Sequence, residues 1–342
     1  MSERTSPRLP DGVALTAVPW DDEHAGQLRA EQQAELLERY GEPDIEPHLP
    51  TQEMVATVLV SRDGEVAGCG SLRAYGPGRG ELKRMYVRPG VRGQGLGRLV
   101  LAELERLAAA HGISRLLLET GVRQPEAIRL YRSAGYRRVP NYGPYLGVSS
   151  SVCYGRSLDP AARTHVLVVN GTMGAGKTTI ASAIADLLRE DGTAHAWVDV
   201  DALCQAWPRP PEDPYAQDLA FAGLAGLAPA LTAQGYRHVV LARVVEDAAD
   251  RERYEQAFDG ADVTIVRLDA REPTRVARLV EREPAGYWQD LALARTVELE
   301  SNLRRLDLDD AVIDNDERAA RRVAQDVLRV AGWTLETRTA TA

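Results

Sequence analysis

Glu81-Leu-Lys-Arg-Met-Tyr-Val-Arg-Pro-Gly-Val-Arg-Gly-Gln-Gly-Leu-Gly97 is the stretch of sequence that says most about the fold. It begins as a strand, passes through a glycine-rich turn and continues as a helix. Three glycines within five residues let the backbone curl so that several N–H groups point to one spot, and the helix that follows adds the positive end of its dipole. We expect this turn to hold a pyrophosphate group, with Arg92 adding charge; a tight turn without a ligand is the alternative.

The residues on either side of this stretch predict a mixed sheet. Apolar runs of strand length and the hairpin turn Asp63-Gly64 precede it, and strands and helices alternate after it. Antiparallel strands that give way to β-α-β-α units are typical of an α+β domain with a mixed sheet. The expected strands are 13–18, 54–61, 66–74, 81–87, 114–120, 136–140 and 150–154, and the expected helices are 24–40, 95–111 and 125–134.

The pattern Arg92-x-x-Gly95-x-Gly97 resembles the pyrophosphate-binding signature of the GNAT N-acetyltransferase superfamily. The resemblance covers roughly residues 10–155 and includes Leu118-Glu-Thr-Gly121 and Ala127-Ile-Arg-Leu-Tyr-Arg-Ser-Ala-Gly-Tyr136. It implies that acetyl-CoA lies where two parallel strands splay apart, with the backbone amides near Tyr86 and Val87 holding the pantetheine arm.

The resemblance also gives a set of residues for the acetyl-CoA site. The family usually has an asparagine shortly before the second helix, where Gln124 stands in this chain, so the side-chain contact of that asparagine is not carried over. The residues expected to contact acetyl-CoA are Met85, Tyr86, Val87, Arg92, Gly93, Gln94, Gly95, Leu96, Gly97 and Arg98.

Three side chains are candidates for the chemistry, which needs a deprotonated amine and a stabilised or protonated thiolate. Tyr131 matches the tyrosine that similar acetyltransferases place near the CoA sulfur, and we interpret it as the general acid; an aromatic side chain packed in the core is the alternative. Glu81, at the start of the central strand, is the first candidate for the general base, and Glu119, at the end of the neighbouring strand, is the second. For either carboxylate a structural or solvated role is the alternative.

The acceptor of the acetyl group is expected to be a small molecule that carries an amine. In similar acetyltransferases the segment between the first helices overhangs the acceptor site, and in this chain that segment is acidic. An acidic overhang would attract a cationic amine; a solvated helix face is the alternative. The acids are Asp21, Asp22, Glu23, Glu31, Glu35, Glu38, Glu42, Asp44 and Glu46.

A polar, proline-containing stretch ends this first domain, which we place at residues 1–157 with a linker at 158–164. From 165 to 333 strands and helices alternate, which predicts a doubly wound parallel sheet. The tail 334–342 lacks apolar periodicity and is expected to be flexible. The expected strands of the second domain are 165–170, 194–199, 238–245, 262–268 and 311–314.

The second domain opens with a strong motif. His165-Val-Leu-Val-Val-Asn170 is a buried-strand run, Gly171-Thr-Met-Gly-Ala-Gly-Lys-Thr178 follows it, and a helix continues from Thr179. This matches G-x-x-x-x-G-K-[ST] in the strand–loop–helix context of a P-loop. Backbone N–H groups would cradle the phosphates of ATP, Lys177 would bridge the β and γ oxygens, and the Thr178 hydroxyl would bind Mg²⁺. The expected ATP contacts are Gly171, Thr172, Met173, Gly174, Ala175, Gly176, Lys177, Thr178 and Thr179.

The rest of the second domain favours a kinase over a nucleotide-dependent switch. Trp197-Val-Asp-Val-Asp201 ends the second strand with two carboxylates, whereas Arg243 interrupts the strand in which a switch would place its magnesium-binding Asp. The layout resembles small-molecule P-loop kinases such as gluconate, shikimate, adenylylsulfate and chloramphenicol kinases. The resemblance implies that Asp199 or Asp201 is the base for an acceptor hydroxyl; a strand-end turn or a water-mediated magnesium contact is the alternative.

The resemblance to these kinases also assigns roles to arginines and to a loop. Arginines among Arg275, Arg278 and Arg282, at helical spacing after the fourth strand, would clamp the phosphates from a lid; an exposed helix charge is the alternative for each. Ile313-Asp-Asn315 stands where similar kinases pack the adenine against backbone.

The overall composition narrows the class of partners. The net charge of −9 disfavours general binding to nucleic acid or to an anionic membrane. The cysteines Cys69, Cys153 and Cys204 have no metal-ligand spacing, which favours a reducing, cytoplasmic setting. No apolar segment has the character of a signal peptide or the length of a membrane span, so the protein is expected to be soluble.

Together these features predict an α/β protein of two domains with two group-transfer activities. The hypothesis is an acetyl-CoA-dependent N-acetyltransferase fused to an ATP- and Mg²⁺-dependent small-molecule kinase. A metabolite or antibiotic with amine and hydroxyl groups would suit both activities. The alternative is an acetyltransferase regulated by a nucleotide-binding sensor domain that makes no phosphorylated product.

Overall fold

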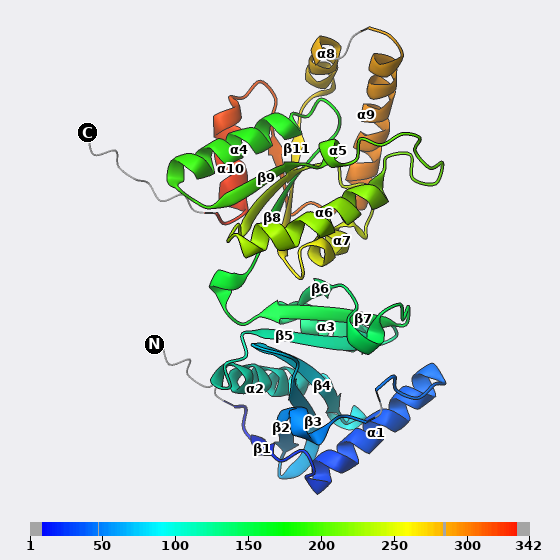
Figure 1. Cartoon of the computed structure of the whole chain (residues 1–342), viewed down its shortest axis with the longest axis vertical. Helices are drawn as coiled ribbons and strands as arrows, with labels where there is room; N and C mark the ends of the chain where they lie inside the picture. The colour runs from blue at the N-terminus through cyan, green and yellow to red at the C-terminus, as the bar shows by residue number, and fades with distance from the viewer. Residues whose placement is uncertain (1–8, 47, 283–284, 334–342) are drawn as a thin grey trace, which may run out of the picture. The chain divides into compact units, whose positions relative to one another are not determined.

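The computed structural model describes residues 9–46, 48–282 and 285–333 of the chain. The chain divides into two compact units, Met1–Ala161 and Ala162–Ala342, and the division falls within the segment 158–164 that the sequence suggests as a linker (Figure 1). The tail 334–342, which is expected to be flexible, lies outside the described residues.

A mixed sheet forms the centre of the first unit, as the sequence predicts. Its strand order is β1-β2-β3-β4-β5-β7-β6. β4 and β5 pair in parallel, and the other neighbouring pairs are antiparallel. The strands are β1 (Val13–Val18), β2 (Met54–Arg62), β3 (Glu65–Ala74), β4 (Arg79–Val87), β5 (Arg115–Gly121), β6 (Arg137–Val139) and β7 (Ser151–Ser157).

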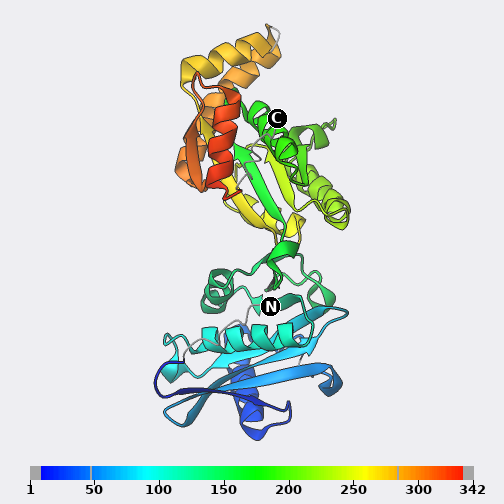
Figure 2. The ribbon, with the colours of Figure 1, turned by 90° about the vertical axis from the view of Figure 1, so that its left-hand side faces the viewer.

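Helices cover both faces of this sheet. α1 (Glu23–Tyr40) packs on one face through Leu28, and its N-terminus is capped by Asp22, whose side chain accepts a hydrogen bond from the Ala25 amide at 2.9 Å. α2 (Leu96–Ala110) and α3 (Pro125–Ser133) pack on the other face, which carries the larger apolar core. Figure 2 shows α1 in blue and α2 in cyan on opposite sides of the strands. Because the larger apolar core lies on the face covered by α2 and α3, the α1 face of the central strands can also carry polar side chains.

A bulge in β4 separates it from β5. β4 and β5 pair from Arg79 and Arg115 as far as Leu82 and Leu118, and the pairing stops there. The next residues of β4 pass a register shift against β3, and within it Arg84 has a left-handed backbone with φ of 57°. A bulge bends the strand that carries it and raises its twist. Beyond the bulge β4 remains paired with β3, so a wedge opens between β4 and β5.

The second unit contains a parallel sheet with the strand order β12-β11-β8-β10-β9. β8 lies in the middle, with β10 on one side and β11 on the other, so the loop after β8 sits where the connections change direction. Ligands of doubly wound sheets bind at such a switch point. The strands are β8 (His165–Asn170), β9 (His195–Asp199), β10 (His238–Ala242), β11 (Asp262–Asp269) and β12 (Ala311–Asp314).

β10 is shorter than the sequence suggests. It ends at Ala242, whereas the apolar run predicts a strand as far as Val245. The residue that follows, Arg243, still donates its backbone amide to the carbonyl oxygen of Val169 in β8 at 3.3 Å, and its buried guanidinium turns toward Asp201 and Gln217.

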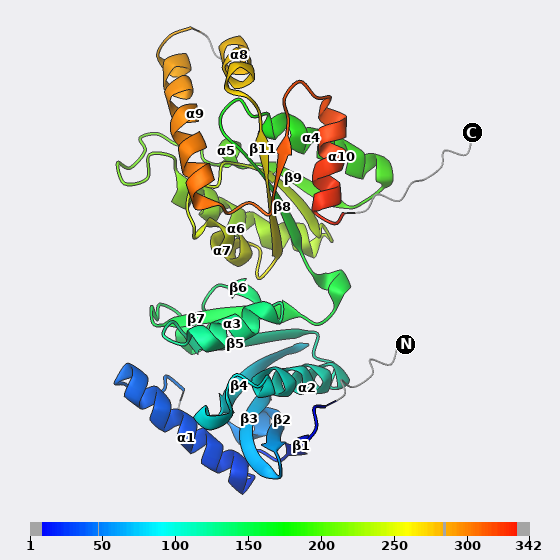
Figure 3. The same cartoon turned by 180° about the vertical axis from the view of Figure 1, so that it is seen from behind.

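Helices lie on both faces of the second sheet, which makes it doubly wound. One core includes side chains of α4 and α10, and another includes side chains of α6 and α7. Figures 1 and 3 show α8 and α9 side by side at the end of the sheet where α4 begins. The helices are α4 (Lys177–Asp191), α5 (Val200–Leu203), α6 (Gln217–Ala233), α7 (Asp250–Ala257), α8 (Glu272–Arg282), α9 (Tyr287–Leu306) and α10 (Ala320–Val330).

Within the residues that the structure describes, no helix is both long enough and apolar enough to cross a membrane.

α2 packs tightly on the sheet at Gly70 of β3. A Cβ atom there would lie 2.4 Å from Sδ of Met85 and 2.7 Å from Cγ1 of Val100. We expect Gly70→Val to destabilise the first unit by about 1–3 kcal/mol, the usual cost of overpacking. Hydrogen exchange of the full chain, followed by mass spectrometry, should show faster exchange in β3 and α2 and unchanged exchange in β8.

Gly90→Ala is the matched control, because a Cβ atom at Gly90 would meet nothing within 4 Å. Equal exchange rates in the Gly70→Val protein and the Gly90→Ala protein would contradict the packing described for α2.

Candidate functional site

The glycine-rich turn of the first unit has the geometry of an open backbone cradle. Gly93 and Gly95 both have φ of 79°, and a Cβ atom at either position would meet nothing within 4 Å. Gly95 directly precedes α2 and takes the place of its N-cap. Glycine adopts this left-handed backbone without the strain that another residue would bear. The turn therefore leaves open space next to the N-terminus of α2, the end of a helix that favours an anion.

The two arginines expected at this turn have protein partners. Arg92 donates hydrogen bonds to both carboxylate oxygens of Glu35 in α1, at 3.1 and 2.6 Å, and to the carbonyl oxygen of Val87 at 2.8 Å. Arg98 donates to Oγ of Ser133 at 2.6 Å. The hydrogen bond that Arg92 donates to Glu35 raises the pKa of Arg92 above its usual value. An anion at this turn would compete with Glu35 for Arg92.

The wedge between β4 and β5 leaves the end of β4 accessible. Residues 81–84 of β4 are buried, whereas Met85, Tyr86 and Val87 are partly exposed. The carbonyl oxygen of Met85 accepts a hydrogen bond from Nε2 of Gln32 at 2.9 Å. The residues expected to hold the pantetheine arm come shortly before the glycine-rich turn in the sequence. In the structure they lie on a strand edge that β5 does not cover.

Two of the candidate catalytic residues, Glu119 and Tyr131, influence each other through charge. Glu119 is partly exposed near the end of β5, and Oγ of Ser151 donates a hydrogen bond to it at 2.6 Å. Burial raises the pKa of Glu119 above its usual value, although the Ser151 hydrogen bond acts in the opposite direction. Tyr131 is buried, and burial together with the charge of Glu119 raises its pKa. A carboxyl group with a raised pKa holds a proton more readily than an ordinary one, and a buried phenol stays protonated, so the first suits a base and the second suits an acid.

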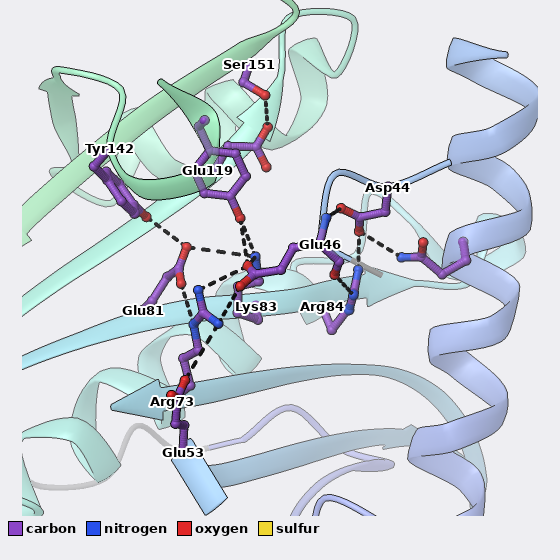
Figure 4. A network of polar contacts seen from close by, with 12 residues as sticks. Asp44, Glu46, Glu53, Arg73, Glu81, Lys83, Arg84, Glu119, Tyr142 and Ser151 are labelled. Atoms are coloured by element: carbon purple, nitrogen blue, oxygen red, sulfur yellow. Dashed lines mark hydrogen bonds and ion pairs between the residues drawn. The ribbon is translucent and has the colours of Figure 1, made fainter. Parts of the chain in front are cut away.

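Glu81 has a different environment. Its side chain has no exposed surface, and both of its oxygens accept hydrogen bonds: Oε2 from Nε of Arg73 at 2.6 Å, and Oε1 from the hydroxyl of Tyr142 at 2.9 Å (Figure 4). A carboxylate that is fully paired and buried is poorly placed to accept a proton from an acceptor amine.

A polar network that the sequence does not reveal joins Glu81 to the loop after α1. Glu46 of this loop binds Arg73 of β3 in a bidentate pair, at 2.8 and 3.0 Å, and also accepts a hydrogen bond from Lys83 of β4 at 2.9 Å. The Tyr145 hydroxyl donates to the same carboxylate at 3.2 Å. Figure 4 shows Glu46 between Arg73 and Lys83, with Asp44 beside Arg84. The network lies on the α1 face of the central strands.

A pocket of about 500 Å³ opens beside this network. It is bounded by the loop after α1, the end of β3 and the loop before β7. The lining residues are Glu46, Pro50, Glu53, Arg73, Ala74, Tyr75, Gly76 and Pro144. Part of its lining, Glu46 and Pro50, belongs to the loop after α1, near the segment that is expected to overhang the acceptor site.

Four acids of the run 21–46 are paired inside the protein. Asp44 pairs with Arg84, Glu46 with Arg73 and Lys83, and Glu31 with Arg88. Glu35 is shared by Arg92 and Arg39. The charge that the sequence suggests for attracting a cation is thus balanced at these four acids by basic side chains. Except for Arg39, these partners lie far away in the sequence, so their pairing leaves no local pattern.

In the second unit, the glycine-rich loop 171–176 is enclosed by residues that arrive from α8, α9 and the end of β12. A Cβ atom at Gly174 would lie 2.7 Å from the carbonyl oxygen of Arg275. Arg278 donates to the carbonyl oxygens of Gly174 and Asn315 at 3.3 and 2.9 Å, and Asn315 donates to the Ala175 carbonyl at 2.7 Å. The close approach at Gly174 and the left-handed backbone of Gly176 explain why these positions are glycine.

Lys177 begins α4 and reaches back across the loop. Its Nζ donates to the carbonyl oxygen of Thr172 at 3.0 Å. Although part of the residue is exposed, burial of the ammonium group lowers the pKa of Lys177 to about 8, and the charges of Asp201 and Asp199 act against this shift. Thr178 and Thr179 are exposed on the first turn of α4.

The arginines expected to clamp phosphates differ from one another. Arg275 is buried, donates to the Ala270 carbonyl at 2.9 Å and pairs with Glu300, so its role is structural. Arg278 contacts the glycine-rich loop directly. Arg282 is exposed, and its charge contributes to the lowered pKa of Lys177.

The two carboxylates at the end of β9 also differ. Asp199 caps α5, accepting a hydrogen bond from the Asp201 amide at 3.1 Å. Asp201 pairs with the buried Arg243 at 2.7 Å. Among the described residues, no group of three or more histidine, cysteine, aspartate or glutamate side chains is arranged to hold a metal ion.

Comparison with known proteins places the first unit in a family. Residues 20–136 match the acetyltransferase (GNAT) family. The chain is 45% identical over 89 residues to an IAA acetyltransferase of Azospirillum brasilense, a match that covers 26% of this chain and 58% of that protein, so the chain spans less than two thirds of that relative.

Two further relatives are matched over more of their length. An uncharacterized N-acetyltransferase of Schizosaccharomyces pombe is 34% identical over 134 residues, which cover 38% of this chain and 70% of that protein. A solved structure of a putative acyl-CoA N-acyltransferase from Klebsiella pneumoniae is 33% identical and covers 43% of this chain and 98% of its own, with a TM-score of 0.39. Through its first unit, the chain belongs to the acetyltransferase (GNAT) family.

Proposed function

We propose that the first unit transfers the acetyl group of acetyl-CoA to the amine of a small molecule. The observation that carries this proposal is the wedge after Leu82 and Leu118, which leaves Met85, Tyr86 and Val87 partly exposed close in the chain to an open glycine cradle. Membership of the acetyltransferase (GNAT) family supports it.

The proposed binding of acetyl-CoA uses backbone more than side chains. The amides around Tyr86 and Val87 would bind the pantetheine arm, and the amides of 93–98 would bind the pyrophosphate at the N-terminus of α2. A flexible charged chain bound mainly by backbone groups needs a strand edge and a turn free of side chains. The open space at Gly93 and Gly95 meets this need.

The proposed chemistry includes two proton transfers, one from the amine and one to the sulfur. Acetyl-CoA, as the second substrate, supplies a thioester whose carbonyl carbon the amine attacks. Glu119 accepts the proton that the amine loses as the new C–N bond forms, and Tyr131 donates a proton to the sulfur as the C–S bond breaks. Glu81 holds Arg73 in place instead of acting as the base, because both of its oxygens are engaged.

For the second unit we propose ATP-dependent phosphoryl transfer to a small molecule. The glycine-rich loop with Lys177 and Thr178, at the switch point of a parallel sheet, supports binding of ATP and Mg²⁺. Lys177 would neutralise charge on the transferring phosphoryl group, and Arg278 and Arg282 would bind the phosphates. Because Asp201 is held by Arg243, Asp199 is the proposed base.

Glu119→Gln tests the assignment of the base. A base acts only when it is deprotonated, and a raised pKa means that Glu119 loses its proton at a higher pH than an ordinary glutamate. In the wild-type protein, lowering the pH should therefore begin to reduce kcat/KM at pH values that are still above the usual glutamate pKa. In Glu119→Gln it should be lower by about 10²- to 10⁴-fold and should lack this fall.

Tyr131→Phe is the comparison for this experiment. It should lower the rate but keep the fall at low pH, because the base is still present. The same pH profile in wild-type and Glu119→Gln proteins would show that another group is the base.

Lys177→Ala tests the phosphoryl-transfer proposal. Loss of the lysine should remove most phosphorylated product, since a positioned cation contributes about 3–4 kcal/mol to such a transition state. Acetyl transfer should not change, because the residues proposed for it all lie before residue 162. Mass spectrometry of metabolites incubated with ATP, Mg²⁺ and acetyl-CoA measures both products.

The sensor alternative predicts a different result in this experiment. If ATP accelerates acetyl transfer in the wild-type protein but not in Lys177→Ala, and neither protein makes a phosphorylated product, then the second unit is a regulator and the kinase proposal is wrong.

A further inference from the structure

The carboxylate of Glu46 occupies a set of donors that is rigid, buried and cationic. Four hydrogen bonds converge on it: two from Arg73, one from Lys83 and one from the Tyr145 hydroxyl. Burial alone would raise the pKa of Glu46, but the hydrogen bonds from Lys83 and Arg73 outweigh it and lower the pKa. Bidentate and charge-assisted bonds of this kind recognise a carboxylate by shape as well as by charge.

The donors and the carboxylate differ in how firmly the fold holds them. Arg73 and Lys83 lie on paired strands and are 3% and 8% exposed, and Tyr145 is 1% exposed. Glu46 lies between Gly41 and Pro50 on a loop that forms no helix or strand in its described residues, and Glu42 and Ile45 on the same loop are exposed. The side chain of Glu46 can therefore turn away while its backbone carbonyl keeps the hydrogen bond from Arg84, whereas the donors cannot move without unpacking the core.

The position of these donors suits an acceptor of the acetyl group. Glu46 and Arg73 line the pocket of about 500 Å³. On the other side, Lys83 and Glu119 directly follow Leu82 and Leu118, the last paired residues of β4 and β5, and Figure 4 shows both side chains in the same region. A small molecule with its carboxylate at Arg73 and Lys83 would thus have its amine on the side of Glu119, the proposed base.

The charge balance favours an acceptor with a carboxylate over a simple amine. With Glu46 displaced, Arg73 would keep Glu81 and the more exposed Glu53, whereas the buried ammonium group of Lys83 would keep only Glu81, at 3.8 Å. Leaving a buried charge unpaired is strongly unfavourable. An acceptor carboxylate would restore the balance, and an amine without one would add a further positive charge.

We propose that Arg73, Lys83 and Tyr145 form a carboxylate-binding part of the acceptor site, and that Glu46 fills it until an acceptor that bears both an amine and a carboxylate, such as an amino acid, displaces it. This inference rests on the proposed acetyltransferase function and specifies the substrate class of that same site.

A first experiment measures whether these donors bind a free carboxylate. In full-length Glu46→Ala, which lacks Cγ and the carboxylate, propionate supplies a free carboxylate, and propionamide is its uncharged match. Propionate should raise the Tm in a saturable way and propionamide should not. The effect should be absent in Glu42→Ala, which removes an exposed acid of the same loop, and in Glu46→Ala combined with Lys83→Met. Equal shifts with propionate and propionamide would overturn the proposal.

A second experiment measures the substrate preference of the wild-type protein. Amino acids are compared with the amines that result from their decarboxylation, such as tryptophan with tryptamine, by release of the CoA thiol. The acid should have a kcat/KM about tenfold or more above its amine, the size expected for hydrogen bonds to a charged group. Lys83→Met should lose this preference, and Glu46→Gln, which keeps the volume of the side chain, should lower KM for the acid.

Calorimetric titration of each protein with acetyl-CoA separates the two proposals. A wild-type protein that does not bind acetyl-CoA would contradict the acetyltransferase function itself. A protein that binds acetyl-CoA but acetylates the acids no better than the amines, whether both react or neither does, would overturn the carboxylate proposal alone.

Discussion

The left-handed backbone at Arg84 is the constraint on which the first unit depends. A non-glycine residue in this conformation costs about 1–3 kcal/mol and persists only where its surroundings hold it. Here the guanidinium is held by Asp44 and by the carbonyl oxygen of Glu46, which accepts a hydrogen bond at 2.7 Å. The bulge at this residue takes β4 away from β5 while its pairing with β3 continues. The wedge, the exposed edge of β4 and the direction in which the chain enters the glycine-rich turn all follow from it.

In both units, the side chains that are proposed to bind ligands already have partners within the protein. Arg92 is paired with Glu35, and the donors around Lys83 are paired with Glu46. In the second unit Lys177 is bonded to Thr172, and Arg278 to Gly174. A ligand at any of these positions must replace a partner that already satisfies the charge. Such competition lowers affinity but raises selectivity, because only a ligand of matching charge and shape restores what is lost.

The sequence predicts the elements well because strand and helix patterns are local. The glycines at 93, 95, 174 and 176 stand out since their left-handed backbones need that residue type. What the sequence does not predict is pairing across the fold. Glu46 lies 27 residues before Arg73 and 99 before Tyr145, and nothing in either segment signals the other.

The same limit explains where individual expectations fail. The acidic run after Asp21 suggests a surface that attracts cations, but Glu31, Glu35, Asp44 and Glu46 meet basic partners from β3, β4 and the glycine-rich turn. The apolar run predicts β10 as far as Val245, whereas the strand ends at Ala242 and the side chain of the next residue, Arg243, pairs with Asp201. In each case the partners are distant in the sequence.

The central claim is that acetyl-CoA binds in the wedge between β4 and β5. Hydrogen exchange of the full chain with saturating acetyl-CoA tests it most directly. Exchange should slow at 85–87 and at 93–98, while 171–179 should be unchanged. Unchanged exchange at the end of β4 and at the glycine-rich turn, or slowing confined to the second unit, would contradict it.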